Sequence, residues 1–333
     1  MALLEERQIS VRSKSVRLFL IMARVHNRKV GGNMRKILTA LLVSAPLLFA
    51  QQAPRVFTIQ DLFTRNVGNT EQQNKQFPPH MIIGNVYYVG TESLSSFLVT
   101  TPQGHILINS IFERNVPTIQ DSVQKLGFKF EDIKILLGSH AHGDHQEGDG
   151  LVVKLAGARA MAMAEDIPLL QMMRSPGGIP RPMYETLHDG SEVKLGNVTL
   201  TAHHTPGHTP GCTTWTMKVQ DGGRSYDVLI IGSVGVNPGT NLVGNLQLVE
   251  QYRQSFKFLH SAHVDVPLGS HPAMYSMAEK YAKLKSSAPS PFIDPAGFQN
   301  EIAIQETALN NELKRQQVEG PPPPRGGGRR GQD

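Results

Sequence analysis

The first half of the chain alternates short apolar runs with turn residues. Residues 82–89, 96–101 and 105–109 are rich in β-branched, aromatic and other apolar side chains, and Pro102-Gln-Gly separates the last two runs. Short runs of this kind, bounded by turn signals, are typical of consecutive strands. The pattern therefore predicts a β-meander near the start of the domain.

A helix and a buried strand follow the meander. Apolar residues recur at helical spacing between residues 116 and 126, and Gly127 ends the helix. Residues 133–137 form a short apolar run that leads directly into the polar segment Gly138-Ser-His-Ala-His-Gly-Asp-His145. We expect this segment to be a loop at the carboxyl end of a buried strand, followed by a helix around residues 150–156.

The second half repeats this order of strands and helix. The pattern predicts strands near residues 192–195, 198–201, 215–219 and 228–231, then a helix over 249–259 and a closing helix over 298–315. Strands followed by a helix, twice, indicate a layered α/β sandwich. Between the halves, residues 175–182 contain too much Pro and Gly for regular structure, and we expect a lid or rim loop there.

Composition and charge exclude some functions. The chain is 39% hydrophobic and 18% charged, as globular proteins are. Its net charge of +5 lies mostly in residues 1–33 and 319–333, and the body between them is close to neutral. A neutral body has no basic stripe along which phosphates could bind, so no nucleic-acid partner is expected. The Pro/Gly/Arg segment 319–333 cannot bury apolar surface, and we expect it to be disordered.

Residues 34–50 have the form of a secretory signal peptide. Met34-Arg-Lys is basic, residues 37–49 are apolar, and Ala50 is a small residue suited to cleavage. The apolar run is too short for a comfortable membrane span, so no stable membrane insertion is expected. An anchor or a buried helix is the alternative, but Gln51-Gln-Ala-Pro follows at once. We therefore expect a periplasmic or secreted domain over residues 51–318, with residues 1–33 outside the fold.

The single cysteine, Cys212, excludes an intrachain disulfide. Stability must then come from the core and from any bound metal. Cys212 is either a ligand or nucleophile beside the histidines, or a small buried residue in a turn. Its neighbours Pro210, Gly211 and Thr213 favour the buried turn residue.

The histidines cluster as metal binding requires. His140 and His142 are two residues apart, so their imidazoles can converge on one ion, and Asp144 and His145 are close enough to reach a second. Imidazoles and a carboxylate are ligands that suit zinc. The spacing therefore predicts a metal site with room for two ions.

Other histidines compete for the remaining ligand positions. A Pro/Gly-rich turn carries His203, His204 and His208, of which only one or two are needed. His271 follows a short run that is typical of a buried strand. His260 and His263 lie in or just after the predicted helix, so a surface location fits them better.

Together these motifs resemble the metallo-β-lactamase superfamily, and within it subclass B3. The resemblance covers about residues 78–285, and its motifs are Tyr88-Val-Gly-Thr-Glu, Thr100-Thr-Pro-Gln-Gly-His-Ile-Leu-Ile, Leu126-Gly-Phe, Ser139-His-Ala-His-Gly-Asp-His, Asp189-Gly and His204-Thr-Pro-Gly-His-Thr-Pro-Gly. It implies an α/β fold, the four-layer αββα metallo-β-lactamase sandwich. Two positions depart from the family. Asn109 stands where an acidic residue is common, and Gln146-Glu-Gly-Asp replaces small or apolar residues, which predicts a more hydrated helix start.

The resemblance also implies a set of ligands for two Zn²⁺ ions. The first ion would be held by His140, His142 and His208. The second would be held by Asp144, His145 and His271. His203 and His204 would then be structural neighbours of the ligands.

The implied activity is hydrolysis of the β-lactam amide bond of a small-molecule substrate, which confers antibiotic resistance. Two zinc ions make a hydroxide available near neutral pH, and Asp144 would orient this zinc-bound hydroxide. Ser233 lies at the strand end where relatives place a bridging Asp or a Cys. Its hydroxyl is expected to contact a substrate carboxylate, and an ordinary strand-end hydroxyl is the alternative.

Two other functions stay open from the sequence. Another hydrolase of the same fold, such as a lactonase, would use the same ligands. A protein that binds a metal or ligand without catalysis is the second alternative. Six ligands around two ions leave positions open for water, whereas structural zinc sites are normally closed, so catalysis is favoured.

Overall fold

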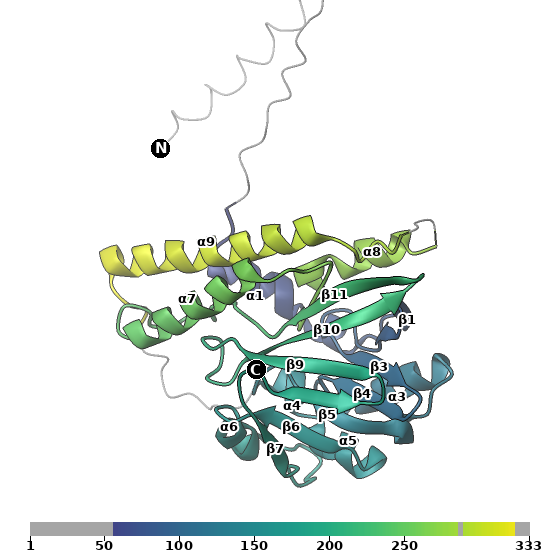
Figure 1. Ribbon diagram of the computed structural model, residues 1–333. Coiled ribbons are helices and arrows are strands. Elements are labelled where there is room, and N and C mark those ends of the chain that lie inside the picture. Colours follow the sequence, from purple (N-terminus) through teal and green to yellow (C-terminus); the bar gives the residue numbers. More distant parts are fainter. Residues whose placement is uncertain (1–55, 286–288, 324–333) are drawn as a thin grey trace, which may run out of the picture. The chain divides into compact units, whose positions relative to one another are not determined.

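The computed structural model describes residues 56–285 and 289–323, which form two β-sheets and the helices that cover them (Figure 1). The first sheet has seven strands in the order β1-β2-β3-β4-β5-β6-β7. Strands β1 to β4 pair antiparallel, as the predicted meander requires, and β4 to β7 pair parallel. The strands are β1 (His80–Ile83), β2 (Val86–Tyr88), β3 (Phe97–Thr101), β4 (Gly104–Ile108), β5 (Ile133–Leu137), β6 (Arg159–Met163) and β7 (Tyr184–Leu187).

The second sheet has five strands in the order β12-β11-β10-β9-β8. Its strands pair antiparallel, except that β11 and β12 are parallel. They are β8 (Glu192–Leu195), β9 (Val198–His204), β10 (Thr213–Asp221), β11 (Arg224–Ile231) and β12 (Val266–Gly269). The predicted strands of the second half all occur, but β9, β10 and β11 are longer than the sequence pattern indicated.

Helices cover the outer face of each sheet. In chain order, α1 (Ile59–Val67) and α2 (Thr70–Asn74) precede the first sheet. Four helices lie between strands of that sheet: α3 (Val116–Lys125), α4 (Gly143–Gln146), α5 (Asp149–Ala156) and α6 (Ile167–Met172). Helix α7 (Leu246–Ser261) lies between β11 and β12, and α8 (Met277–Lys283) and α9 (Pro295–Glu319) follow β12. Helix α1 packs against α9. Short 3₁₀ turns lie at Glu113–Asn115, Phe130–Asp132 and Pro272–Tyr275.

Two apolar clusters account for the layers. The larger one fills the space between the sheets, where it joins Ile106 and Ile135 of the first sheet to Leu200 and Trp215 of the second, and it continues to buried residues of α7 and α9. The smaller one lies on the other face of the first sheet, where the apolar side of α3 and Val152 of α5 pack against β4 and β5. In Figure 1, α7, α8 and α9 lie on the outer side of β10 and β11. The result is the predicted four-layer αββα sandwich.

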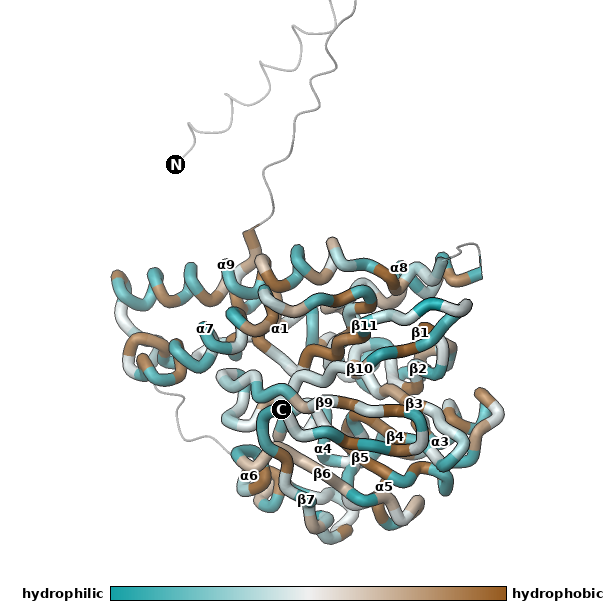
Figure 2. The backbone as a smooth tube through the Cα atoms, in the orientation of Figure 1, coloured by the Kyte–Doolittle hydropathy of each residue, from teal (hydrophilic) through white to brown (hydrophobic). Residues whose placement is uncertain are grey.

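The helix α9 closes the second sheet because one of its faces is apolar. Polar and apolar residues alternate along its length (Figure 2). One face of α9 is buried in the larger apolar cluster, at the spacing that places residues on one side of a helix. The buried residues on this face include Phe298, Ile302, Leu309 and Leu313. The predicted closing helix therefore exists and extends beyond residues 298–315 at both ends.

One segment of the first sheet differs from the sequence-based prediction. Residues 82–89 are two strands rather than one, because Gly84 adopts a positive φ of 51° in the turn between them.

The signal peptide, the extension 1–33 and most of the Pro/Gly/Arg segment lie outside the described residues. Among those described, none of the helices is long and apolar enough to span a membrane.

Candidate metal centre

The motif that follows β5 divides into a loop and a short helix. His140 and His142 lie in the 138–142 loop, whereas Asp144 and His145 belong to α4. The carbonyl oxygen of His142 accepts from the main-chain N–H groups of His145 and Gln146 at 3.1 and 3.0 Å, and this begins the helix. The prediction that the whole segment is a loop was therefore wrong for its second half.

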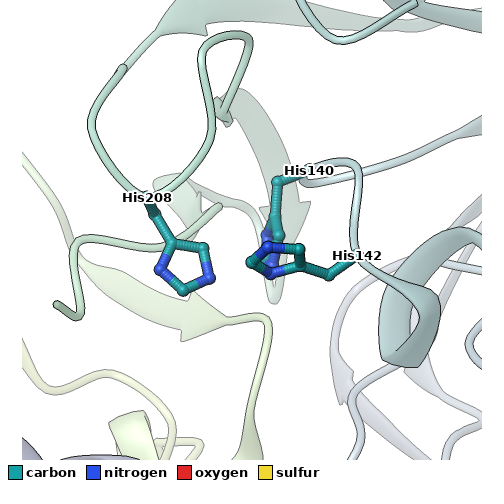
Figure 3. A group of neighbouring side chains, drawn as sticks. All are labelled: His140, His142 and His208. Atoms are coloured by element: carbon teal, nitrogen blue, oxygen red, sulfur yellow. The ribbon is translucent and has the colours of Figure 1, made fainter. Parts of the chain in front are cut away.

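His140, His142 and His208 meet at one point, and we call them the histidine triad. His208 comes from the 205–212 loop, which joins β9 to β10 in the second sheet. One ring nitrogen of each residue lies within 4.8 Å of one ring nitrogen of each of the others. Figure 3 shows His208 approaching from one loop and the other two rings from another. Three imidazole nitrogens this close could hold one metal ion.

Asp144, His145 and His271 form a second group, the aspartate triad. The Oδ2 atom of Asp144 lies 3.2 Å from Nε2 of His145 and 3.7 Å from Nε2 of His271. His271 follows β12, so this group also joins the two sheets. The ligand atoms of His140, Asp144 and His145 lie within 4.8 Å of one another, so the two triads adjoin.

Hydrogen bonds on the far side of three imidazoles fix their orientation. Nδ1 of His208 donates to the carbonyl oxygen of Gly235 at 2.7 Å, and Nδ1 of His271 donates to that of Ser93 at 3.0 Å. Nδ1 of His140 lies 3.2 Å from the Ser139 hydroxyl. In each ring the other nitrogen, Nε2, is left for the centre. Sequence reasoning did not identify Gly235 and Ser93 as partners, because main-chain carbonyl groups leave no signal in a sequence.

The nitrogen atoms left over fit a metal ion. Nε2 of His140 is buried and has no hydrogen-bond partner among the described residues, and Nε2 of His145 also makes no hydrogen bond. Buried polar atoms normally have partners, and an unpaired one costs free energy. A divalent ion would satisfy these nitrogens, so the donor set fits zinc.

Burial and mutual proximity keep the imidazoles of His140, His208 and His271 neutral. Burial lowers the pKa of His140 well below its usual value, and it lowers the pKa of His208 to about 3 and that of His271 to about 4. Burial alone would raise the pKa of Asp144, but the adjacent His145 and His271 outweigh it and hold that pKa below its usual range. Neutral imidazoles and an ionised carboxylate are the forms that bind a metal.

The remaining histidines have other contacts. Nε2 of His203 lies 2.7 Å from the Thr216 hydroxyl, and Nε2 of His204 lies 2.7 Å from the carbonyl oxygen of Pro210. Neither belongs to a potential metal-binding group of the described residues. His260 is exposed and pairs with Glu306. His263 is also exposed and stands 3.8 Å from both Asp227 and Asp265, so it lies on the surface, as expected.

Comparison with known proteins identifies the family. The model of the metallo-beta-lactamase superfamily matches residues 89–271. The native FEZ-1 metallo-β-lactamase from Legionella gormanii is 45% identical, with a TM-score of 0.69, over 74% of this chain and 98% of that one. The chain belongs to the metallo-β-lactamase superfamily.

Other matches refine the place within the superfamily. BJP-1, a subclass B3 metallo-β-lactamase of Bradyrhizobium japonicum, is 36% identical, with a TM-score of 0.70, over 75% of this chain and 98% of that one. Persulfide dioxygenase ETHE1 of Homo sapiens, a mitochondrial protein, is 26% identical over 131 residues, which is 39% of this chain and 45% of that protein. The chain thus matches less than half the length of this curated relative. The predicted resemblance to subclass B3 is confirmed by the structural matches.

The two departures from the metallo-β-lactamase pattern have different outcomes. Asn109 is fully buried, and its Oδ1 accepts from the main-chain N–H of Ser139 at 2.8 Å, so it still supports the 138–142 loop. The expectation of a more hydrated helix start was wrong, because Gln146 and Asp149 are buried. Asp149 accepts from Tyr184 at 2.8 Å and lies 3.4 Å from the guanidinium of Arg181 in the rim loop. These polar side chains satisfy one another.

Ser233 and Cys212 lie beside the site. Cys212 is fully buried and its thiol donates to the carbonyl oxygen of Ser233 at 3.3 Å. Burial raises the pKa of this thiol well above its usual value, which disfavours a ligand or nucleophile. Ser233 follows β11, and its hydroxyl accepts from the Gly235 N–H at 3.3 Å. The carbonyl oxygen of Gly235 accepts from His208, so Ser233 contacts the residue that orients one member of the histidine triad.

Proposed function

We propose that the protein is a zinc-dependent β-lactamase that hydrolyses the β-lactam amide bond. The observation that carries this proposal is the junction of two triads, which together offer five imidazoles and one carboxylate beside one another. The similar structures from Legionella gormanii and Bradyrhizobium japonicum bear the name metallo-β-lactamase. Their similarity over nearly their whole length supports the same reaction here.

The histidine triad would hold one Zn²⁺ ion and the aspartate triad the other. When bound, the two ions supply a hydroxide near neutral pH and polarise the lactam carbonyl. Each triad draws ligands from both sheets, so the rigid core between the sheets fixes the distance between ligands. The hydrogen bonds to Gly235 and Ser93 keep Nε2 of His208 and His271 directed at the centre.

Asp144 has a second task in this proposal. Its carboxylate is 16% exposed, whereas His145 beside it is fully buried. An ionised carboxylate at the edge of the centre can accept a hydrogen bond from the attacking water and so orient it. No protein nucleophile is then required, which agrees with the burial of the Cys212 thiol.

We propose that Ser233 and the rim loop of residues 175–182 contribute to substrate binding. Ser233 lies next to the residue that orients His208, so a substrate on the metal ions would lie near it. Its hydroxyl could donate to the substrate carboxylate directly or through a water molecule. We also propose export of the mature domain after cleavage near Ala50, because β-lactam antibiotics act outside the cytoplasm.

A hydrolysis screen tests the proposed function. Purified protein loaded with two equivalents of Zn²⁺ is mixed with nitrocefin, a penicillin and imipenem, with and without a chelator. We expect turnover of at least one β-lactam that the chelator abolishes and added Zn²⁺ restores. A homoserine lactone is assayed in parallel. Turnover of the lactone alone would replace the proposal with a lactonase.

A further inference from the structure

A buried carboxylate, Asp166, joins the two loops that carry the histidine triad. Asp166 follows β6 at the position before the first residue of α6, and it is only 2% exposed. Aspartate at such a position usually accepts a hydrogen bond from the first turn of its own helix. Asp166 makes no such bond, so its carboxylate is directed elsewhere.

All three hydrogen bonds to this carboxylate come from the metal-binding loops. In the 138–142 loop, the main-chain N–H of Ala141 donates to Oδ2 at 2.8 Å. In the 205–212 loop, the hydroxyl of Thr209 donates to Oδ2 at 2.7 Å and the N–H of Gly211 donates to Oδ1 at 2.7 Å. Because every partner is a donor, an ionised carboxylate is the group that satisfies them all.

Two of the three donors are immediate neighbours of the histidine triad in the chain, and the third, Gly211, is three positions after His208. Ala141 lies between His140 and His142, and Thr209 follows His208. The 205–212 loop also approaches Asp166 very closely. A Cβ atom added at Gly211 would lie 2.5 Å from the main-chain nitrogen of Asp166, so only glycine fits there. The sequence and the fold therefore bring both loops onto one carboxylate.

We propose that Asp166 is a positioning residue that sets the separation of His140, His142 and His208 and thereby the Zn²⁺ affinity of the histidine triad. Asp166 belongs to none of the potential metal-binding groups of the described residues, and its oxygens already accept from the loops. The inference rests on the proposed zinc centre but not on the identity of the substrate. Partners that orient ligands typically contribute about 10- to 100-fold to metal affinity.

The test is the substitution Asp166→Asn in the full chain. The amide keeps the size of the side chain, but its NH₂ group cannot accept a hydrogen bond and must face one of the three donors. At least one hydrogen bond between the loops and residue 166 is therefore lost. Zn²⁺ affinity is measured by competition with a chromophoric chelator, and bound metal is counted after dialysis. We expect the affinity of one of the two sites to fall by about 10- to 100-fold.

Glu301→Gln is the matched control. Glu301 is 5% exposed, its carboxylate accepts hydrogen bonds from Arg65 and Gln305, and it belongs to neither triad. This variant also loses a buried, hydrogen-bonded carboxylate, so it reports what such a loss does to the fold alone. An equal fall in Zn²⁺ affinity in this control would overturn the proposal.

Two ligand variants show which site Asp166 serves. In a His271→Ala background the histidine triad is the intact site, and we expect Asp166→Asn to weaken it fully. In a His208→Ala background the histidine triad is already broken, and we expect Asp166→Asn to change the remaining affinity by less than about twofold. Equal effects in the two backgrounds would mean that Asp166 supports the fold in general.

A milder variant covers the case in which Asp166→Asn does not fold. Thr209→Val removes a single hydroxyl donor to Asp166 and keeps the shape of the side chain. We expect a smaller fall in affinity at the same site, and no change would contradict the proposal. These measurements use zinc alone. Failure of β-lactam hydrolysis with the expected affinity changes would therefore refute the proposed substrate and leave the role of Asp166 standing.

Discussion

The two triads differ in where their negative charge lies. The aspartate triad contains its own carboxylate, because Oδ2 of Asp144 stands 3.2 Å from one imidazole and 3.7 Å from another. The histidine triad consists of neutral imidazoles, and the carboxylate nearest its loops, Asp166, binds their main chain instead. The carboxylate of Asp144 is thus placed where it could bind a metal ion, whereas the carboxylate of Asp166 holds the loops that carry the histidine triad. Substitution of Asp144 should therefore reduce activity most, whereas substitution of Asp166 should reduce metal affinity.

The largest expected effect follows substitution of Asp144. Asp144→Ala removes a proposed metal ligand and the group proposed to orient water, so we expect kcat for nitrocefin to fall by more than about 100-fold. Loss of a residue that only hydrogen-bonds to a ligand typically costs about 10- to 100-fold, and loss of the ligand itself should cost more. Circular dichroism should show that the fold is retained. Wild-type activity in this variant, measured with excess Zn²⁺, would remove Asp144 from the mechanism.

Loss of one histidine from either triad should have the next largest effect. We expect His208→Ala and His271→Ala each to retain about one equivalent of metal in place of two, because each change leaves the other triad complete. Metal content after gel filtration measures this. His260→Ala is the control, since His260 is exposed, pairs with Glu306 and belongs to neither triad. Two tightly bound equivalents in His208→Ala would contradict the division into two triads.

Sequence patterns predicted the parts of this centre that lie close together in the chain. The spacing of His140, His142, Asp144 and His145 identified a metal motif, and the apolar run 133–137 placed it at a strand end, as β5 confirms. The choice of His208 over its two neighbours came from family resemblance. Sequence spacing could not supply it, because the choice depends on how the second sheet packs against the first.

Other features were missed for physical reasons. The strand β6 consists of Arg-Ala-Met-Ala-Met, which lacks the β-branched and aromatic residues that mark strands, and its burial between β5 and β7 decides its structure. Asp166 has no motif, since its partners are at least 25 positions away in the chain. One missed element had a signal: Thr58 and Asp61 form a capping box that begins α1.

The pH dependence of the metal-free protein tests the burial of the triads. His208 and His271 have folded-state pKa values of about 3 and about 4, below the ordinary value of 6.5. The unfolded chain therefore binds protons first, and the stability that depends on these residues is complete above pH 6.5 and is lost as the pH falls toward 4 and then 3.

We expect the melting temperature of chelator-treated protein to fall between pH 7 and pH 4.5, because the free energy of unfolding decreases by up to about 1.4 kcal/mol per pH unit for each histidine. Thermal unfolding followed by circular dichroism measures this. His271→Asn should show a shallower decline than the wild type. A stability that does not change over this range would contradict the burial of neutral imidazoles.

The smallest expected effect concerns Ser233, which belongs to neither triad. If its hydroxyl binds the substrate carboxylate, the bond exists in both the bound substrate and the transition state, so its loss should raise KM and leave kcat nearly unchanged. A hydrogen bond of about 1 kcal/mol corresponds to an increase of about fivefold in KM. Steady-state kinetics of Ser233→Ala measures this. The control is Ser290→Ala, because the hydroxyl of Ser290 donates to the Ile82 carbonyl.

Because Ser233 also accepts from Gly235, whose carbonyl orients His208, zinc content must be measured in the same samples. A fall in kcat with loss of zinc would show that Ser233 supports the histidine triad and does not bind the substrate.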